Sequence, residues 1–149
     1  MPLNLRHAQE ELRTQLNAAA LPLVNFVTTL EDALSTADLA IDCVPDELES
    51  KLEIFCLMDR MAPPRTVFVT PSVNQSIADL ASCTYRPEKC VAILRSPRNF
   101  IAASEMHGSP LQLAMTSRTA GEVREMVEQF FSMLGFSTET SLDAAESAR

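Results

Sequence analysis

The stretch that most constrains the fold is residues 37–60, ADLAIDCVPDELESKLEIFCLMDR. Residues 39–44 form a short, mostly apolar run, typical of a strand covered on both faces, and a proline follows it. Asp46 then stands at a predicted helix N-cap, with Glu49 three residues later as in a capping box. Apolar side chains continue at helical spacing through 46–60. A strand that turns directly into a helix is where α/β proteins bind ligands, because free N–H groups and the helix dipole point out of that edge.

The rest of the chain continues this alternation of strands and helices. Such alternation predicts an α/β fold with a mostly parallel sheet and flanking helices. The last segment, residues 137–149, is polar, and we expect it to be a disordered tail. The expected helices cover 3–19, 30–34, 46–60, 75–83 and 120–134, and the expected strands cover 24–28, 38–44, 66–70, 90–94, 103–107 and 112–116.

Composition excludes several classes of partner. The net charge is −8, which argues against nucleic acid and anionic membranes, since both are bound through basic patches. No apolar run is long enough to cross a bilayer. The N-terminus carries acidic residues and no apolar core of a signal peptide. We therefore expect a cytoplasmic protein that contacts neither nucleic acid nor membrane.

The numbers and positions of the glycines and cysteines limit the kinds of ligand site that this sequence can form. The three glycines are Gly108, Gly121 and Gly135, so these 149 residues hold neither a GxGxxG fingerprint nor a P-loop. The four cysteines show no CxxC spacing and have no histidine nearby, so no metal site is expected. We interpret them as reduced, buried small hydrophobic residues.

Residues 3–136 resemble the NAD-binding domain of the 3-hydroxyacyl-CoA dehydrogenases. The family has a strand of the type ADLVIEAVPE leading into a helix, and this chain reads ADLAIDCVPDELESKLEIF. The family continues with a Pro-Pro turn, a strand ending SNTSS, and RPER before a strand, and this chain reads APPRTVFVTPSVNQSIADLASCTYRPEKC. The resemblance implies a truncated Rossmann-type domain over 1–136. It also implies NAD as cofactor, an acyl-CoA substrate, and oxidoreductase chemistry on 3-hydroxyacyl-CoA in fatty-acid metabolism.

In the family, certain positions line the nicotinamide ribose, and the resemblance implies that these positions correspond to residues within 37–60 of this chain. They fall on Cys43, Val44, Asp46 and Lys51. Asp46 would accept a hydrogen bond from a ribose hydroxyl. The alternative from the residues alone is that Asp46 is only an N-cap and Lys51 only an exposed, solubilising charge.

The catalytic positions of the family are mostly replaced. The serine position falls on Val73, the histidine position on Leu94 and an asparagine position on Pro97, while the glutamate is kept as Glu105. Leucine cannot accept a proton, so the resemblance implies a dehydrogenase-like protein with impaired catalysis. The alternative is a non-catalytic, degenerate Rossmann-like module with an interaction or regulatory role.

The family also has segments with no counterpart in this sequence. These are the glycine-rich βαβ unit that binds ADP and a helical C-terminal domain. Without the first unit, a strand edge is expected to lie open. We therefore expect a homo-oligomer, or a partner subunit that covers this edge.

Overall fold

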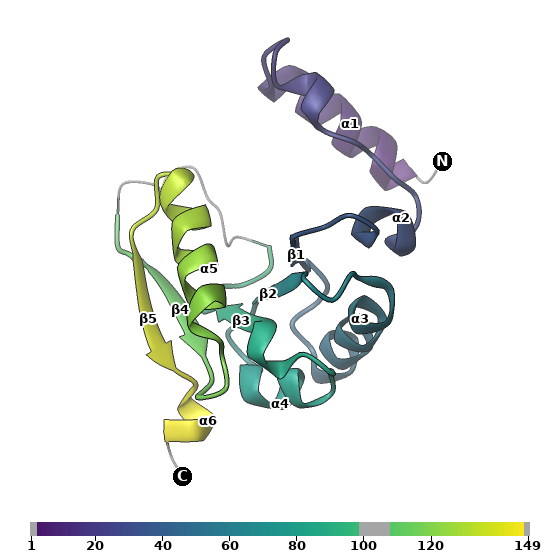
Figure 1. The fold of residues 1–149 in the computed structure, drawn as a ribbon. Coiled ribbons are helices and arrows are strands. Elements are labelled where there is room, and N and C mark those ends of the chain that lie inside the picture. The colour runs from purple at the N-terminus through teal and green to yellow at the C-terminus, as the bar shows by residue number, and fades with distance from the viewer. Residues whose placement is uncertain (1–2, 99–107, 148–149) are drawn as a thin grey trace.

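The computed structural model describes residues 3–98 and 108–147, which form one five-stranded sheet with helices on both faces (Figure 1). Strand order follows the chain, and every neighbouring pair is parallel except β3 and β4. The predicted α/β fold with a mostly parallel sheet is confirmed. The strands are β1 (Leu39–Ile41), β2 (Val67–Pro71), β3 (Cys90–Ile93), β4 (Leu111–Met115) and β5 (Thr138–Leu142).

Helices cover the two faces of the sheet unequally. On one face α3 and α4 pack over β1–β3, and on the other α5 packs over the central and later strands (Figure 1). The helices are α1 (Leu3–Gln15), α2 (Leu30–Leu34), α3 (Leu48–Met61), α4 (Ile77–Ser82), α5 (Gly121–Met133) and α6 (Ala144–Ser147), with 3-10 turns at Leu21–Leu23 and Pro87–Lys89. None of these helices is long and apolar enough to cross a membrane.

Two apolar layers hold the helices to the sheet. Under α3 and α4, the rings of Phe55 and Phe68 meet edge to face, with centroids 6.0 Å apart. Under α5, Val127 and Phe131 are fully buried against the valines and leucines of the strands. This is why the apolar periodicity of 46–60 and 120–134 predicted both helices: each has one stripe that the sheet removes from water.

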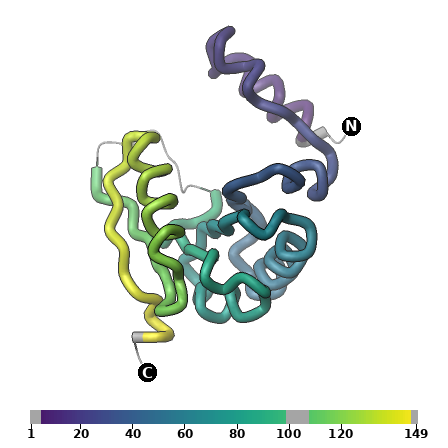
Figure 2. The backbone as a smooth tube through the Cα atoms, viewed as in Figure 1, coloured from purple at the N-terminus to yellow at the C-terminus, as the bar shows by residue number. Residues whose placement is uncertain are grey.

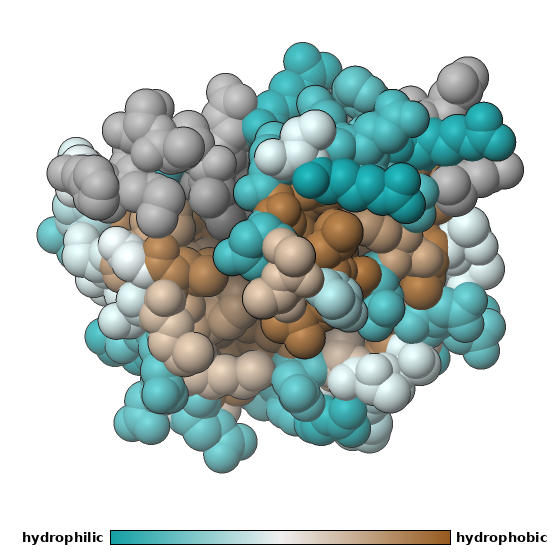
Figure 3. Space-filling view, turned by 90° about the horizontal axis from the view of Figure 1, so that it is seen from above, coloured by the Kyte–Doolittle hydropathy of each residue, from teal (hydrophilic) through white to brown (hydrophobic). Residues whose placement is uncertain are grey.

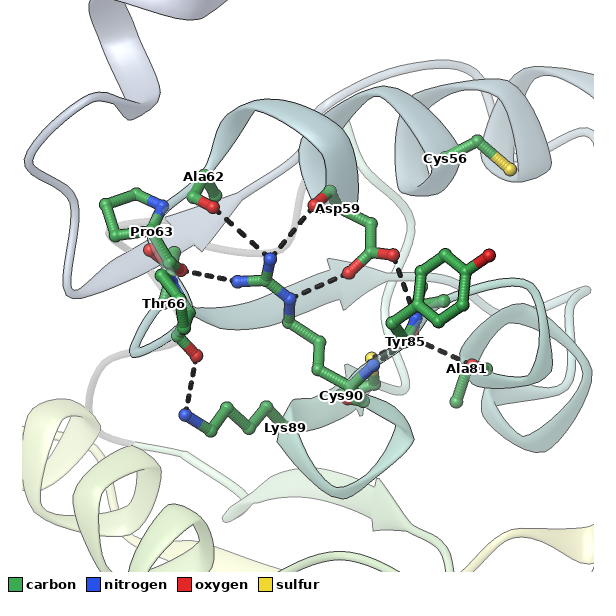
Figure 4. A network of polar contacts seen from close by, with 12 residues as sticks. Cys56, Asp59, Ala62, Pro63, Thr66, Ala81, Tyr85, Lys89 and Cys90 are labelled. Carbon is green, nitrogen blue, oxygen red and sulfur yellow. Dashed lines mark hydrogen bonds and ion pairs between the residues drawn. The ribbon is translucent and has the colours of Figure 1, made fainter.

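The C-terminal end of α3 is fixed by a single arginine. The Arg86 guanidinium donates to Asp59 Oδ1 over 2.7 Å and to the carbonyl oxygens of Asp59, Ala62 and Pro63 (Figure 4). It also lies 4.8 Å from the centroid of the Phe68 ring. The helix therefore ends on a side chain from the turn before β3, which satisfies carbonyls that would otherwise lack partners.

Two expectations about local structure are wrong. Residues 24–28 form no strand, and α1 ends at Gln15 rather than at residue 19. The N-cap residue of α5 is Ala120, and the neighbouring Thr119 hydroxyl accepts from the Thr116 N–H. The expected strand at 103–107 lies outside the described residues.

The expectation of a disordered tail over 137–149 is also wrong for most of that segment. Residues 138–142 form β5, which pairs in parallel along the full length of β4, and α6 follows. Thr140 also donates to Glu128 on α5 over 2.7 Å. The segment is held by backbone hydrogen bonds and polar contacts, which a hydropathy pattern does not reveal.

The N-terminal helix stands apart from the rest of the molecule. Figures 1 and 2 show α1 extending away from the sheet on an irregular arm. Every α1 side chain from Leu5 to Gln15 keeps some exposure, although Leu5, Ala8 and Leu12 lie at helical spacing. The apolar stripe of α1 is therefore not packed into the core.

Candidate functional site

The candidate site lies where β1, β2 and β3 end at the same edge of the sheet. These three strands are parallel, so the turns that follow them meet there. The turn after β1 carries Asp42 to Asp46, the turn after β2 carries Ser72 to Ser76, and Leu94 follows β3. The edge of the sheet at which the sequence predicts ligand binding therefore holds the predicted residues in one region.

Asp46 joins the first two of these turns. Its Oδ1 accepts from the Ser72 hydroxyl over 2.5 Å, and its Oδ2 accepts from the N–H groups of Val73 at 2.9 Å and Asn74 at 3.1 Å. The expected N-cap role is wrong, because the N-cap residue of α3 is Glu47, whose side chain makes no capping hydrogen bond. The turn after β2 donates three hydrogen bonds to the Asp46 carboxylate, so this carboxylate binds that turn and does not cap the helix.

Lys51 is fully buried beneath the same edge. Its Nζ donates to Asp42 Oδ1 over 2.7 Å and to the Pro71 carbonyl oxygen over 3.0 Å. The side chains of Lys51 and Asp42 are 0% and 1% exposed. The alternative of an exposed, solubilising lysine is therefore wrong. Lys51 ties β1 and β2 to α3 by an ion pair and a charge-assisted hydrogen bond.

Sequence reasoning missed Asp42 as the partner of this lysine. An acidic residue at the end of an apolar strand was the available signal, since a buried carboxylate needs a cation or several donors. Asp42 Oδ1 also accepts from the Val44 N–H at 3.3 Å, whereas Oδ2 has no hydrogen-bond partner among the described residues. The carboxylate is thus held on one oxygen only.

Cys43 and Val44 border an apolar pocket beside β1. The pocket has a volume of about 370 Å³, and its other walls come from α2 and α3. Cys43 is exposed, contrary to the expected burial. Partial burial and the Asp42 carboxylate raise the pKa of the Cys43 thiol, and Lys51 opposes that shift. Cys43 is therefore a protonated thiol rather than a nucleophilic thiolate.

The positions of the catalytic serine and histidine come together in a second pocket. Val73 and Leu94 are 60% and 43% exposed, and both line a pocket of about 320 Å³. Pro97 lies in the irregular segment beyond Leu94. Glu105 lies outside the described residues. The described lining therefore presents two hydrocarbon side chains where the family resemblance places a hydroxyl and an imidazole.

Asp143 is the one carboxylate among the described residues that line this pocket. Burial alone would raise its pKa, but hydrogen bonds from the Ser76 hydroxyl at 2.6 Å, the Ala78 N–H at 2.8 Å and other N–H groups outweigh burial. The pKa of Asp143 consequently lies below its usual value. A carboxylate stabilised in this way is a weak base. Its hydrogen bonds attach the segment after β5 to the start of α4.

No cluster of three metal-binding side chains occurs within residues 3–98 and 108–147. The site consists of a frame: the ends of three parallel strands and two turns that are joined by hydrogen bonds to Asp46. Such a frame, on a mostly parallel sheet with helices on both faces, defines the class of Rossmann-like α/β domains.

Comparison with known proteins identifies the family within that class. The family model for the 3-hydroxyacyl-CoA dehydrogenase NAD-binding domain matches residues 3–105. The chain belongs to this family, as its resemblance predicted.

Individual relatives agree with the family assignment. A probable 3-hydroxybutyryl-CoA dehydrogenase of Bacillus subtilis is 27% identical over 89 residues, which are 59% of this chain and 31% of the relative. The 3-hydroxybutyryl-CoA dehydrogenase of Clostridioides difficile is 32% identical over 76 residues, which are 51% of this chain and 27% of the relative. This chain thus matches about a third or less of the length of these curated relatives.

Solved structures show the same fold. The (S)-3-hydroxybutyryl-CoA dehydrogenase of Ralstonia eutropha superposes with a TM-score of 0.73 at 18% identity, over 93% of this chain and 49% of that one. The 3-hydroxybutyryl-CoA dehydrogenase of Escherichia coli superposes with a TM-score of 0.71 at 21% identity, over 93% of this chain and 29% of that one.

Proposed function

We propose that this chain is a 3-hydroxyacyl-CoA dehydrogenase-like protein, linked to NAD and to fatty-acid metabolism. It would form the part of the cofactor site that surrounds the nicotinamide. We also propose that it is catalytically impaired as it stands. Residues 1–136 would form its partial NAD-binding domain. The observation that carries the proposal is the pocket lined by Val73 and Leu94, whose side chains transfer no proton. A cytoplasmic location and an acyl-CoA ligand belong to the same proposal.

The proposed cofactor-binding residues are Cys43, Val44 and Asp46, which would contact the cofactor, and Lys51, which would support them from below. A carboxylate offers about four lone-pair sites, and three donors already occupy Asp46. One ribose hydroxyl therefore fits there, whereas buried Lys51 acts by holding the turn in place. Bound NAD would supply the hydride acceptor, and the described residues would orient its nicotinamide ribose.

Glu105 is the proposed remaining catalytic residue. In the resemblance it pairs with the histidine base, whose position is Leu94 here. Loss of a general base costs about 10²–10⁴-fold in proton transfer. Glu105 would therefore lack the group that it orients.

One observation favours the alternative of an interaction module, which is the open edge of β1. Asp38 and Asp42 hydrogen-bond β2, so the N–H and C=O groups of Leu39 and Ile41 turn toward the free edge. An apolar pocket borders this edge, and Figure 3 shows apolar surface, in brown, open on the face seen from above.

An open strand edge of this kind favours pairing with another chain. We therefore propose a homo-oligomer or a partner subunit that covers β1. Light scattering checks the first case: a mass of at least twice 16.4 kDa supports it, and a monomer at high concentration excludes it.

Titration with NADH tests the proposed cofactor role. Without phosphate-cradling glycines in these residues, we expect affinity near 1 mM, equivalent to about −4 kcal/mol. The fluorescence of NADH should saturate in that range for the chain, and the Asp46→Ala variant should weaken binding further. The Asp79→Ala variant, at an exposed position of α4, is the matched control. Absence of any binding would favour the interaction module, and micromolar affinity would contradict the half-site proposal.

A further inference from the structure

Two of the four cysteines lie against each other. Cys56 is on α3, and Cys83 is the C-cap residue of α4. The Cys56 thiol donates to the Cys83 carbonyl oxygen over 4.0 Å, and the Cys83 thiol donates to the Leu80 carbonyl oxygen over 3.0 Å. Figure 4 shows Cys56 on α3, one helical turn before Asp59. The Cys56 sulfur thus lies against the residue that carries the second thiol, and closeness of the two residues is the first requirement for a disulfide.

The other two cysteines are separate from this pair. Cys43 lies in the turn after β1, and Cys90 is buried in β3, where its Sγ contacts the Thr84 hydroxyl at 3.8 Å. The chain therefore carries its own controls: one exposed cysteine and one buried cysteine outside the pair.

The two thiols of the pair differ in their access to solvent. Cys56 is exposed and Cys83 is half-buried. Burial, followed by the hydrogen bond and charge of the neighbouring Cys56, raises the pKa of Cys83 to about 12. Cys56 is therefore the thiol that meets an oxidant first, and Cys83 is the thiol that stands next to it.

We propose that Cys56 and Cys83 form a reversible disulfide when the protein encounters a hydroperoxide. The Cys56 thiolate attacks the peroxide, so that an S–O bond forms, the O–O bond breaks and an alcohol or water leaves. The Cys83 sulfur then attacks the Cys56 sulfur and loses its proton in the same step, so that the S–S bond forms, the S–O bond breaks and the oxygen leaves with that proton as water. In total two thiols are oxidised to a disulfide while one hydroperoxide is reduced to an alcohol and water.

The bridge would close a segment that matters for the site. Residues 56 and 83 are 27 positions apart, and β2 and the turn clamped by Asp46 lie between them. A crosslink over such a loop restricts the unfolded chain and raises the melting temperature. Oxidation would thus fasten α3 to α4 and make the frame of the two turns more rigid.

The test is oxidation of the full chain with one equivalent of hydrogen peroxide. We expect a mass loss of about 2 Da, consistent with removal of two hydrogens, and a crosslink between tryptic peptides 52–60 and 66–89. The melting temperature should rise by about 5–10 °C, and dithiothreitol should reverse the change. The Cys43→Ser variant should behave as wild type, while Cys56→Ser and Cys83→Ser should each abolish the crosslink.

Two results would overturn the proposal. The first is a crosslink that involves Cys43 or joins two chains. The second is oxidation of Cys56 to sulfenic or sulfinic acid without a bond to Cys83. A folded Cys83→Ser variant, checked by circular dichroism, ensures that a missing crosslink reports the thiol and not loss of structure.

Discussion

Replacing Lys51 with methionine is expected to lower the free energy of unfolding by about 3–5 kcal/mol, because removing one partner of a buried ion pair leaves the other charge uncompensated. Methionine keeps most of the volume, so little of the loss comes from a cavity. The stranded group is Asp42, whose side chain is 1% exposed. Urea unfolding followed by circular dichroism measures the change. We expect a lower urea concentration at the transition midpoint and an unchanged dependence of the free energy of unfolding on urea concentration.

Two companion variants separate charge from packing. Lys89→Met removes the chain's other lysine, whose Nζ donates to the Pro64 carbonyl oxygen at an exposed site, and should cost about 1 kcal/mol or less. The double variant Asp42→Asn/Lys51→Met removes both charges and should recover most of the loss. A Lys51→Met cost no larger than that of Lys89→Met would contradict the buried ion pair.

Elements with a strong apolar stripe could be predicted from the sequence. The strands β2 and β3 and the helix α5 were predicted within two residues, because each buries a periodic set of side chains. Gly135 follows the C-cap residue of α5 and adopts a φ of 89°, as is common for a glycine just after a helix. In these places local pattern and tertiary burial agree.

Polar elements could not be predicted in the same way. Every second residue of β5 is polar and exposed, yet the strand pairs along all of β4. Asp143 then binds the start of α4, which lies more than sixty residues away in the chain. Such contacts depend on the assembled sheet and leave no periodic trace in the sequence.

The candidate site shows the same limit at the level of single residues. The sequence and the resemblance indicated Asp46 and Lys51, and both lie at the predicted edge. The donors for Asp46 were not predictable, because they come from the turn after β2. One of the two acceptors for Lys51, the Pro71 carbonyl oxygen, likewise lies on a strand that follows it in the chain. A lysine within a helix has the same sequence pattern whether it is solvated or paired in the core.

The second large effect concerns catalysis. The family reaction needs a base on the 3-hydroxyl group, and Val73 and Leu94 line the pocket where that base would lie. Without the base, proton transfer loses about 10²–10⁴-fold. Asp143 does not replace it, because its pKa is lowered and its oxygens are already hydrogen-bonded. We therefore expect no measurable oxidation of 3-hydroxybutyryl-CoA by the purified chain.

A turnover assay with 3-hydroxybutyryl-CoA and NAD⁺ tests this central claim most directly. NADH absorbance is followed over a range of chain concentrations, with the Clostridioides difficile 3-hydroxybutyryl-CoA dehydrogenase as the positive control. We expect a rate equal to that of the protein-free reaction at every concentration. A rate that rises in proportion to the chain and disappears in the Glu105→Gln variant would contradict it.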